Sequence, residues 1–320
     1  MTPTIQNDVI PIVVPVPSTL KSINFFLIKH DENLILIDAG LDNEECWAAL
    51  NRALREMNVS LHDLTHILLS HHHADHVGLV NRIVSKHPVP VYAHPLAFPR
   101  LKRDPEFMKA RIQFFARLYE EMGSGEAGRR QVEYLIAAIE KNRSLTLEGD
   151  LKSIPQHSFL GFDMIEIPGH APDQVAFYDP LNKRLFSGDL LIEHISSNAL
   201  VEPDPSGRRL ASLSQHRQSM QKCLHLQAEH LFPGHGSVMG SADELIQKRL
   251  NGMEAKAERF LKLIQKGHKT GSDIAKACYK DVYEKQFSLV MSEVVGHLDY
   301  LESQGRVESI LKSGVRIYSI

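Results

Sequence analysis

The chain contains the stretch Ser70-His71-His72-His73-Ala74-Asp75-His76, which carries the pattern His-x-His-x-Asp-His. Four side chains of this pattern can bind a metal ion, and they lie within six residues. Residues 65–69 before it, which end in Ile67-Leu68-Leu69, predict a short buried strand, and residues 77–80 predict the start of a helix. The stretch therefore predicts a metal site at a strand end, which is where α/β proteins place their sites.

The spacing within this stretch predicts two groups of ligands. In an extended segment, residues i and i+2 point the same way, so His71 and His73 can face one metal while His72 points elsewhere. Asp75 and His76 lie on the turn into the helix and can face a second position. Imidazole and carboxylate together suit Zn, Fe, Co or Mn.

Three later segments share one arrangement, in which a β-like run is followed by a turn of small residues and one metal-compatible side chain. These side chains are His170, Asp189 and His235. Each segment alone is a weak signal, because a single His or Asp after a strand is usually structural. Together with residues 70–76, and in this order, they predict one shared metal centre.

The order His-x-His-x-Asp-His, Pro-Gly-His, Gly-Asp, Gly-His resembles the metallo-β-lactamase superfamily over roughly residues 9–240. The resemblance implies a binuclear site with Asp75 and Asp189 as its catalytic carboxylates. A second site that includes Asp75 is more similar to the glyoxalase II, lactonase and nuclease branches than to the true β-lactamases, which commonly use Cys there. The implied first metal is held by His71, His73 and His170, the second by Asp75, His76 and His235, and Asp189 bridges them.

A longer resemblance runs through residues 168–174, 188–198 and 233–236 and a helical tail. It is similar to bacterial lactamase-like hydrolases and, in layout, to the human lactamase-like endoribonuclease with its C-terminal extension. The substrates of this group are not uniform. The resemblance therefore implies hydrolysis more firmly than it implies a substrate.

The resemblance implies an α/β fold, a four-layer αβ/βα sandwich with a helical insertion and a small C-terminal winged-helix-like domain. We expect a catalytic domain over residues 1–241 and a C-terminal domain over residues 242–320. Helical spacing of apolar residues predicts the insertion at about residues 97–145. The insertion is either a lid over the metals or a helical hairpin packed on the body or on a partner subunit.

Local signals predict the ends of several elements. Asp42 is expected to cap a helix over residues 43–57, with Glu45 completing the cap. The Thr270–Asp273 segment is a capping box, and residues 282–304 predict one long helix before a β-hairpin. The long helix is more acidic than expected for a helix that contacts base edges in a nucleic-acid groove. We therefore expect the C-terminal domain to serve packing or dimerisation, ahead of RNA or DNA contact.

Three further residues are predicted to support the site. Asp38 follows a β-run and is expected to accept a proton from a ligand imidazole. His194 and Asn198 follow Asp189 closely and are expected to border the substrate pocket, where a His can position a substrate oxygen.

Composition favours a cytoplasmic enzyme without membrane segments. No apolar run approaches the roughly 20 residues that a membrane-spanning helix needs, and the N-terminus lacks the pattern of a signal peptide. Three scattered cysteines fit a reducing compartment. The net charge of −3 argues against non-specific nucleic-acid binding. A small-molecule substrate is expected, and the chain is either a monomer or a homodimer.

The predicted function is that of a binuclear metal-dependent hydrolase with two divalent ions, zinc first and iron or manganese as alternatives. A water bridging two cations is activated to hydroxide near neutral pH and can attack the carbonyl of an ester, thioester or lactone. Two alternatives remain open, a phosphodiesterase or endoribonuclease and an iron-dependent persulfide dioxygenase.

Overall fold

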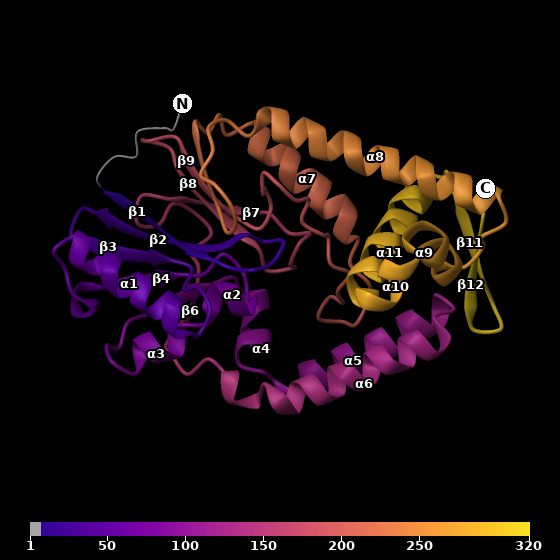
Figure 1. Ribbon diagram of the computed structural model, residues 1–320, viewed down its shortest axis with the longest axis horizontal. Coiled ribbons are helices and arrows are strands. Elements are labelled where there is room, and N and C mark those ends of the chain that lie inside the picture. Colours follow the sequence, from indigo (N-terminus) through magenta and orange to yellow (C-terminus); the bar gives the residue numbers. More distant parts are fainter. Residues whose placement is uncertain (1–7) are drawn as a thin grey trace. The chain divides into compact units, whose positions relative to one another are not determined.

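The computed structural model describes residues 8–320, which form two compact units (Figure 1). The predicted boundary near residue 241 leaves the helical insertion with the catalytic part, whereas the structure groups the insertion with the C-terminal segment. The first unit comprises residues 8–102, Leu147–Ser197 and Ser219–Ile246, and the second comprises Arg103–Thr146, Asn198–Gln218 and Gln247–Ile320.

The first unit contains a six-stranded sheet with the order β1-β2-β3-β4-β5-β6. The first three strands pair antiparallel, and β3 to β6 pair parallel. The strands are β1 (Val9–Pro15), β2 (Ser22–His30), β3 (Asn33–Ile37), β4 (His66–Leu68), β5 (Val91–Ala93) and β6 (Leu151–Ser153).

A second sheet of four strands has the order β10-β9-β8-β7. The predicted hairpin around residues 182–183 is confirmed, because β8 and β9 pair antiparallel, whereas β10 runs parallel to β9. The strands are β7 (Asp163–Glu166), β8 (Val175–Asp179), β9 (Arg184–Gly188) and β10 (His230–Pro233).

The two sheets pack face to face through aromatic side chains. The ring of Phe26 lies 5.2 Å from that of Phe186 and 5.5 Å from that of Phe232, centroid to centroid. Side chains alternate along a strand, so Phe25 and Leu27 point to the opposite face, into the core beneath α1. Both faces of β2 are therefore covered, as the predicted layered α/β sandwich requires.

Helices α1 (Glu44–Glu56), α2 (Ala74–Val77), α3 (Val80–Val84) and α4 (Phe98–Leu101) belong to the first unit, while α7 (Ser212–Leu224) and α8 (Asp243–Gln265) cross the unit boundaries. The predicted cap of α1 at Asp42 is wrong. The cap is Asn43, whose extended backbone lets Oδ1 accept from the N–H of Cys46 at 2.8 Å.

In the second unit, the helical insertion shares a core with the C-terminal segment. Tyr119 of the insertion packs edge-on against Phe287, with ring centroids 5.0 Å apart. The insertion consists of α5 (Pro105–Glu121) and α6 (Gly125–Lys141). The C-terminal elements are α9 (Gly271–Tyr279), α10 (Asp281–Lys285), α11 (Phe287–Ser303), β11 (Glu308–Lys312) and β12 (Val315–Ser319).

Two of the three local predictions for the C-terminal segment are confirmed. Thr270 Oγ1 accepts from the N–H of Asp273 at 3.0 Å, as the capping box requires, and β11 and β12 form the predicted hairpin. The single helix over residues 282–304 is wrong, because Gln286 has non-helical dihedral angles (φ −131°, ψ 41°) that separate α10 from α11. Within α11, His297 is buried in the core, so its side chain cannot contact the groove of a nucleic acid.

The part of the chain described here contains no helix with both the length and the apolar character that crossing a bilayer demands.

Candidate metal centre

The strand ends of the first unit bring the seven predicted ligands together. Residues 71–76 follow β4 and enter α2, and His170 lies in the loop between β7 and β8. Asp189 comes directly after β9, and His235 comes two residues after the end of β10. Since β9 and β10 run parallel, their carboxyl ends deliver both side chains to one rim.

The ligand atoms form three overlapping groups, within each of which all atoms lie within 4.8 Å of one another. Asp189 lies between the other two groups. Its Oδ1 is 3.2 Å from His76 Nε2, and its Oδ2 is 3.2 Å from His235 Nε2 and 3.5 Å from His170 Nε2. The groups are His71, His73 and His170; Asp75, His76 and His235; and His71, His76 and Asp189.

The first group has the spacing of a tetrahedral metal site. His73 Nδ1 lies 2.9 Å from His71 Nε2 and 3.1 Å from His170 Nε2. With Zn–N distances of about 2.0–2.1 Å, two nitrogens of a tetrahedral site are about 3.3 Å apart. The three nitrogens therefore fit one ion.

The ligand atoms of the second group lie farther apart than those of the first. Asp75 Oδ2 lies 3.5 Å from His235 Nε2, and Asp75 Oδ1 lies 4.0 Å from His76 Nε2. The Asp75 side chain is 24% exposed, whereas those of His76 and His235 are fully buried. Asp75 therefore forms the solvent side of this group.

Hydrogen bonds on the far side of three imidazoles fix which nitrogen faces the centre. Nδ1 of His76 donates to Asp38 Oδ2 at 2.8 Å, and Nδ1 of His235 donates to the carbonyl of Ser22 at 2.7 Å. Nδ1 of His71 lies 3.0 Å from Ser70 Oγ, which donates in turn to Asp38 Oδ2 at 2.8 Å. With its proton on Nδ1, each of these rings would turn the Nε2 lone pair toward the centre and a bound metal ion.

Asp38 occupies the supporting position that the sequence predicts for it. Its carboxylate is buried and also accepts from the backbone N–H of Ser70 at 2.7 Å. It thus holds the start of the His loop and the His76 ring in one orientation. Asp38 has a φ of +60°, in the left-handed region that Asp tolerates better than most residues.

Burial and neighbouring charges set the protonation of the site. Burial lowers the pKa of His71 and of His73 well below the usual value, and neighbouring imidazoles lower each further, so both rings are neutral and able to bind a metal. Burial also acts to lower the pKa of His76, but Asp189 and Asp38 outweigh it and raise this pKa. Burial would raise the pKa of Asp189, yet His76 and His235 hold it well below its usual range.

Two buried atoms at the middle of the site face each other without a well-aligned hydrogen bond to any residue that the structure describes. They are His76 Nε2 and Asp189 Oδ1, which lie 3.2 Å apart. A buried polar atom without a partner is costly, and a divalent ion between these two atoms would satisfy both. The donor set of imidazoles and carboxylates therefore fits the divalent ions that the motif implies.

Sequence reasoning missed the contact of the half-buried His72 with the buried Asp173, beside the predicted ligands. His72 Nδ1 lies 2.6 Å from Asp173 Oδ1 and so ties the His loop to the loop after β7. Burial would raise the pKa of Asp173, but His72 and then Arg100 lower it, which keeps the carboxylate ionised. Asp173 stands in the Pro-Gly-His segment, but its position in the sequence does not reveal which side chain it contacts.

The two predicted pocket residues have different surroundings. His194 Nε2 lies 2.9 Å from the carbonyl of Thr19, and its ring packs beside Gly236, next to His235. Asn198 is half-buried and is the first residue of its segment in the second unit. Contact of either residue with a substrate stays a prediction.

Asp38→Asn is expected to weaken metal binding by roughly 10- to 100-fold, the range found for partners of metal-bound histidines. An amide cannot accept at both Oδ positions, so either Ser70 or His76 loses its acceptor. Competition with a chromogenic chelator measures the affinity. Asp31→Asn, at a side chain 84% exposed, is the control. Equal affinities in the two variants would show that Asp38 does not support the ligands.

Comparison with known proteins gives consistent matches along the chain. The sequence model of the Metallo-beta-lactamase superfamily matches residues 18–235. The chain is 33% identical to the probable metallo-hydrolase YqjP of Bacillus subtilis over 95% of both proteins, and 25% identical to a hydroxyacylglutathione hydrolase of Hahella chejuensis over 58% of this chain and 56% of that protein. A metallo-beta-lactamase family protein of Thermus thermophilus has the same fold, with a TM-score of 0.77, 23% identity and 98% coverage of both chains.

Proposed function

Because this chain belongs to the metallo-β-lactamase superfamily and is a metal-dependent hydrolase, we propose that it binds two divalent ions, zinc by preference, and hydrolyses an ester, thioester or lactone of a small molecule. The position of Asp189 carries the proposal of two ions. Its two oxygens lie 3.2 Å from ring nitrogens of His76 and His235, and it also approaches His170 of the other group. One carboxylate between two groups of imidazoles is suited to a binuclear centre.

The side chains of the site have distinct roles in such a reaction. His71, His73 and His170 would hold one ion, Asp75, His76 and His235 the other, and Asp189 both. When bound, the ions would supply the Lewis acidity that activates water and polarises a carbonyl. Asp75 is the most exposed of these carboxylates, so Oδ2 can take up a proton and pass it to the leaving group.

Thiol catalysis does not suit this site. Burial raises the pKa of Cys223 to about 12 and also raises those of Cys46 and Cys278, so these thiols stay protonated near neutral pH. None of these cysteines belongs to the groups of possible metal ligands. These observations support direct attack by water, without a covalent acyl-enzyme.

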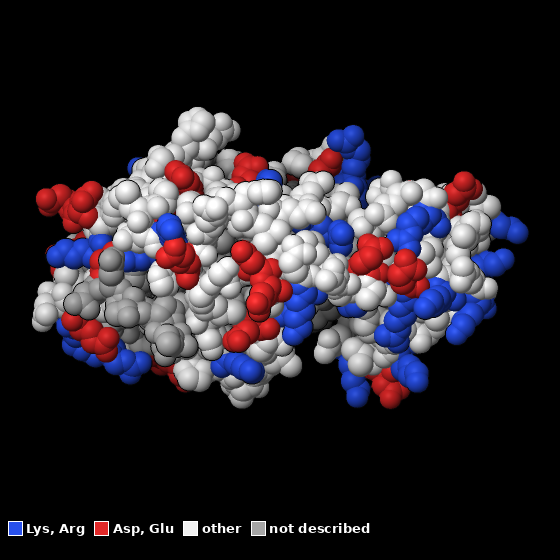
Figure 2. All heavy atoms as spheres, turned by 90° about the horizontal axis from the view of Figure 1, so that it is seen from above, with Lys and Arg blue, Asp and Glu red and all other residues white. Residues whose placement is uncertain are grey.

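The proposed choice of a carbonyl substrate rests on two observations. The hydroxyacylglutathione hydrolase relative carries the name of a thioesterase. The chain has a net charge of −3, and on the face shown in Figure 2 Lys and Arg side chains lie interspersed with Asp and Glu. A binder of nucleic-acid backbones needs a basic surface instead.

Parallel assays on one zinc-loaded preparation test the bond type. The substrates are a glutathione thioester, an acyl lactone, bis(p-nitrophenyl) phosphate and single-stranded RNA. We expect kcat/KM for the thioester or the lactone to exceed that for the phosphodiester. Turnover of RNA or phosphodiester alone would replace the carbonyl proposal with the phosphodiesterase alternative. Oxygen uptake with a persulfide by the iron-loaded protein would support the dioxygenase.

A further inference from the structure

The second unit contains a cationic cavity of about 440 Å³ that the proposed reaction does not use. It is lined by residues of α5, α11 and β12 and of the segment 207–211. The charged side chains that line it have a formal surplus of two positive charges. They are Arg117, Arg208, Arg209 and Arg316, together with Glu121 and Asp299.

Two of the four arginines are fixed by carboxylates. Arg209 Nη2 lies 2.8 Å from Asp299 Oδ1. Arg316 donates from Nη2 to Glu121 at 3.2 Å and from Nη1 to Ser309 Oγ at 3.0 Å, while its Nε is buried without a hydrogen-bond partner. Both guanidinium groups are therefore held in place, and within residues 8–320 they retain N–H donors that no acceptor uses.

The other two arginines form no ion pair with either carboxylate that lines the cavity. Among the residues that the structure describes, Arg117 makes no hydrogen bond or ion pair, and its Nη2 lies near Gly207. Arg208 uses Nε and Nη2 for Asp204 and Ser206 and leaves its Nη1 available. Its side chain is 84% exposed, so these contacts are weakly held.

We propose that this cavity binds the phosphate groups of a small phosphorylated molecule. Guanidinium groups match phosphate oxygens in bidentate geometry, and four of them line this one cavity. With Asp204, which pairs with Arg208, counted beside the lining residues, the local surplus is one positive charge, which suits an anionic phosphate group.

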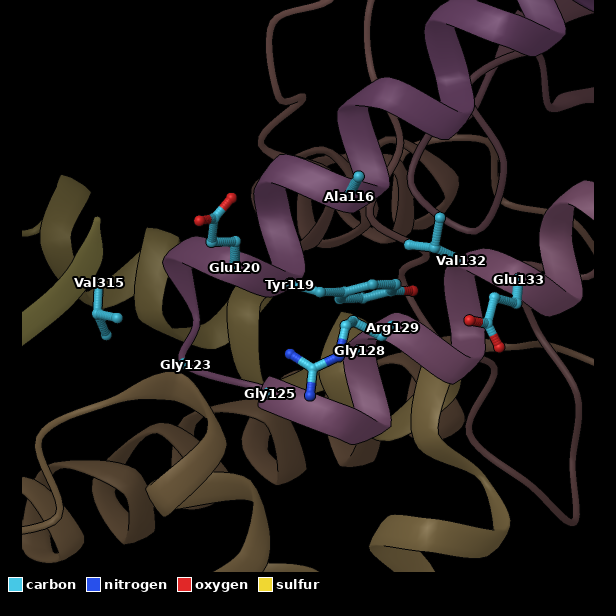
Figure 3. A pocket seen from close by; sticks show the side chains of 10 residues that line it. All are labelled: Ala116, Tyr119, Glu120, Gly123, Gly125, Gly128, Arg129, Val132, Glu133 and Val315. Carbon is cyan, nitrogen blue, oxygen red and sulfur yellow. The ribbon is translucent and has the colours of Figure 1, made fainter. Parts of the chain in front are cut away.

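The shape of the charge distribution favours a small ligand over a nucleic acid. An extended polyanion needs a basic groove that follows its backbone, whereas these arginines surround a single cavity that Glu121 and Asp299 also line. A neighbouring cavity of about 670 Å³, shown in Figure 3, lies against α5 and α6 and differs in character. Its lining arginine, Arg129, forms an ion pair with Glu126 at 2.7 Å.

Calorimetric titration of the zinc-loaded protein with inorganic pyrophosphate tests the site. The double variant Arg117→Gln/Arg208→Gln should bind pyrophosphate roughly tenfold or more weakly than the wild type, because each lost guanidinium removes a charge-assisted hydrogen bond. Arg129→Gln, at a side chain 68% exposed in the same unit, should bind as the wild type does. Pyrophosphate held at the metal centre would be unaffected by either change.

Two outcomes would overturn the proposal. One is equal pyrophosphate affinity in the wild type and the double variant. The other is tight binding of a 20-residue oligouridylate that displaces pyrophosphate and is lost in the double variant, which would make this surface a nucleic-acid site. Because both variants keep every metal ligand, neither outcome depends on whether the proposed hydrolysis is correct.

Discussion

Asp189→Asn should lower kcat/KM by more than about 100-fold. This loss exceeds the roughly 10- to 100-fold loss of activity found when hydrogen-bond partners of metal ligands are mutated. Asp189 Oδ1 is buried 3.2 Å from His76 Nε2, and Oδ2 lies within 3.5 Å of two further imidazoles. An amide keeps the size of the side chain but removes the charge that two cations require. The measurements are steady-state kinetics on the best substrate of the panel and the metal content per chain.

The loss should come with an intact fold. The far-ultraviolet circular dichroism spectrum of Asp189→Asn should match that of the wild type. Asp150→Asn, at a side chain 70% exposed in the same unit, should keep both activity and metal content. Wild-type turnover by Asp189→Asn would exclude a bridging carboxylate.

Gly234→Ala should impair the centre although it replaces no ligand. A Cβ atom on Gly234 would lie 2.5 Å from Asp189 Oδ1 and 2.6 Å from His76 Cε1, distances at which something must shift. The methyl group would therefore displace Asp189 and His76, two of the predicted ligands. We expect loss of at least one ion per chain and a fall in kcat/KM of about 100-fold, comparable to a misplacement of about 1 Å in an active site.

A second glycine of the same region provides the control. A Cβ on Gly240 would have no neighbour closer than 3.9 Å, the carbonyl of Glu229. Gly240→Ala should therefore bind two ions and turn over substrate at the wild-type rate. If Gly234→Ala matches Gly240→Ala in metal content and turnover rate, the close packing around Asp189 does not affect metal binding or catalysis.

The sequence predicted which side chains gather at this rim because the position of each is fixed locally. The spacing of residues 71–76 places side chains on a strand end and the turn after it, and His170, Asp189 and His235 each follow a strand by one or a few residues. Short-range geometry decides such positions, so one sequence suffices to find them.

The supporting contacts could not be predicted in the same way. Nδ1 of His235 donates to the backbone carbonyl of Ser22, an acceptor that every residue type offers. Likewise, Asp173 contacts His72 across about 100 residues of sequence, so only the pairing of distant loops reveals the contact.

Long-range packing also explains why the units of the structure differ from the predicted domain boundary, and why the break in the long helix was missed. The stripe of α5 that contains Tyr119 has helical spacing, but spacing does not say which core receives it, and Phe287 of the C-terminal segment does. The break at Gln286 between α10 and α11 has no proline or glycine to mark it. Tertiary context decides both features.

Metal titration of chelator-stripped protein tests the central claim most directly. The chain is depleted with a chelator, dialysed and titrated with zinc while calorimetry records binding and the hydrolysis rate is followed in parallel. We predict that two zinc ions bind per chain and that the rate recovers only as the ions bind. Depleted protein that binds no divalent ion, or that hydrolyses substrate at the full rate without one, would contradict the assignment of these imidazoles and carboxylates to a catalytic metal centre.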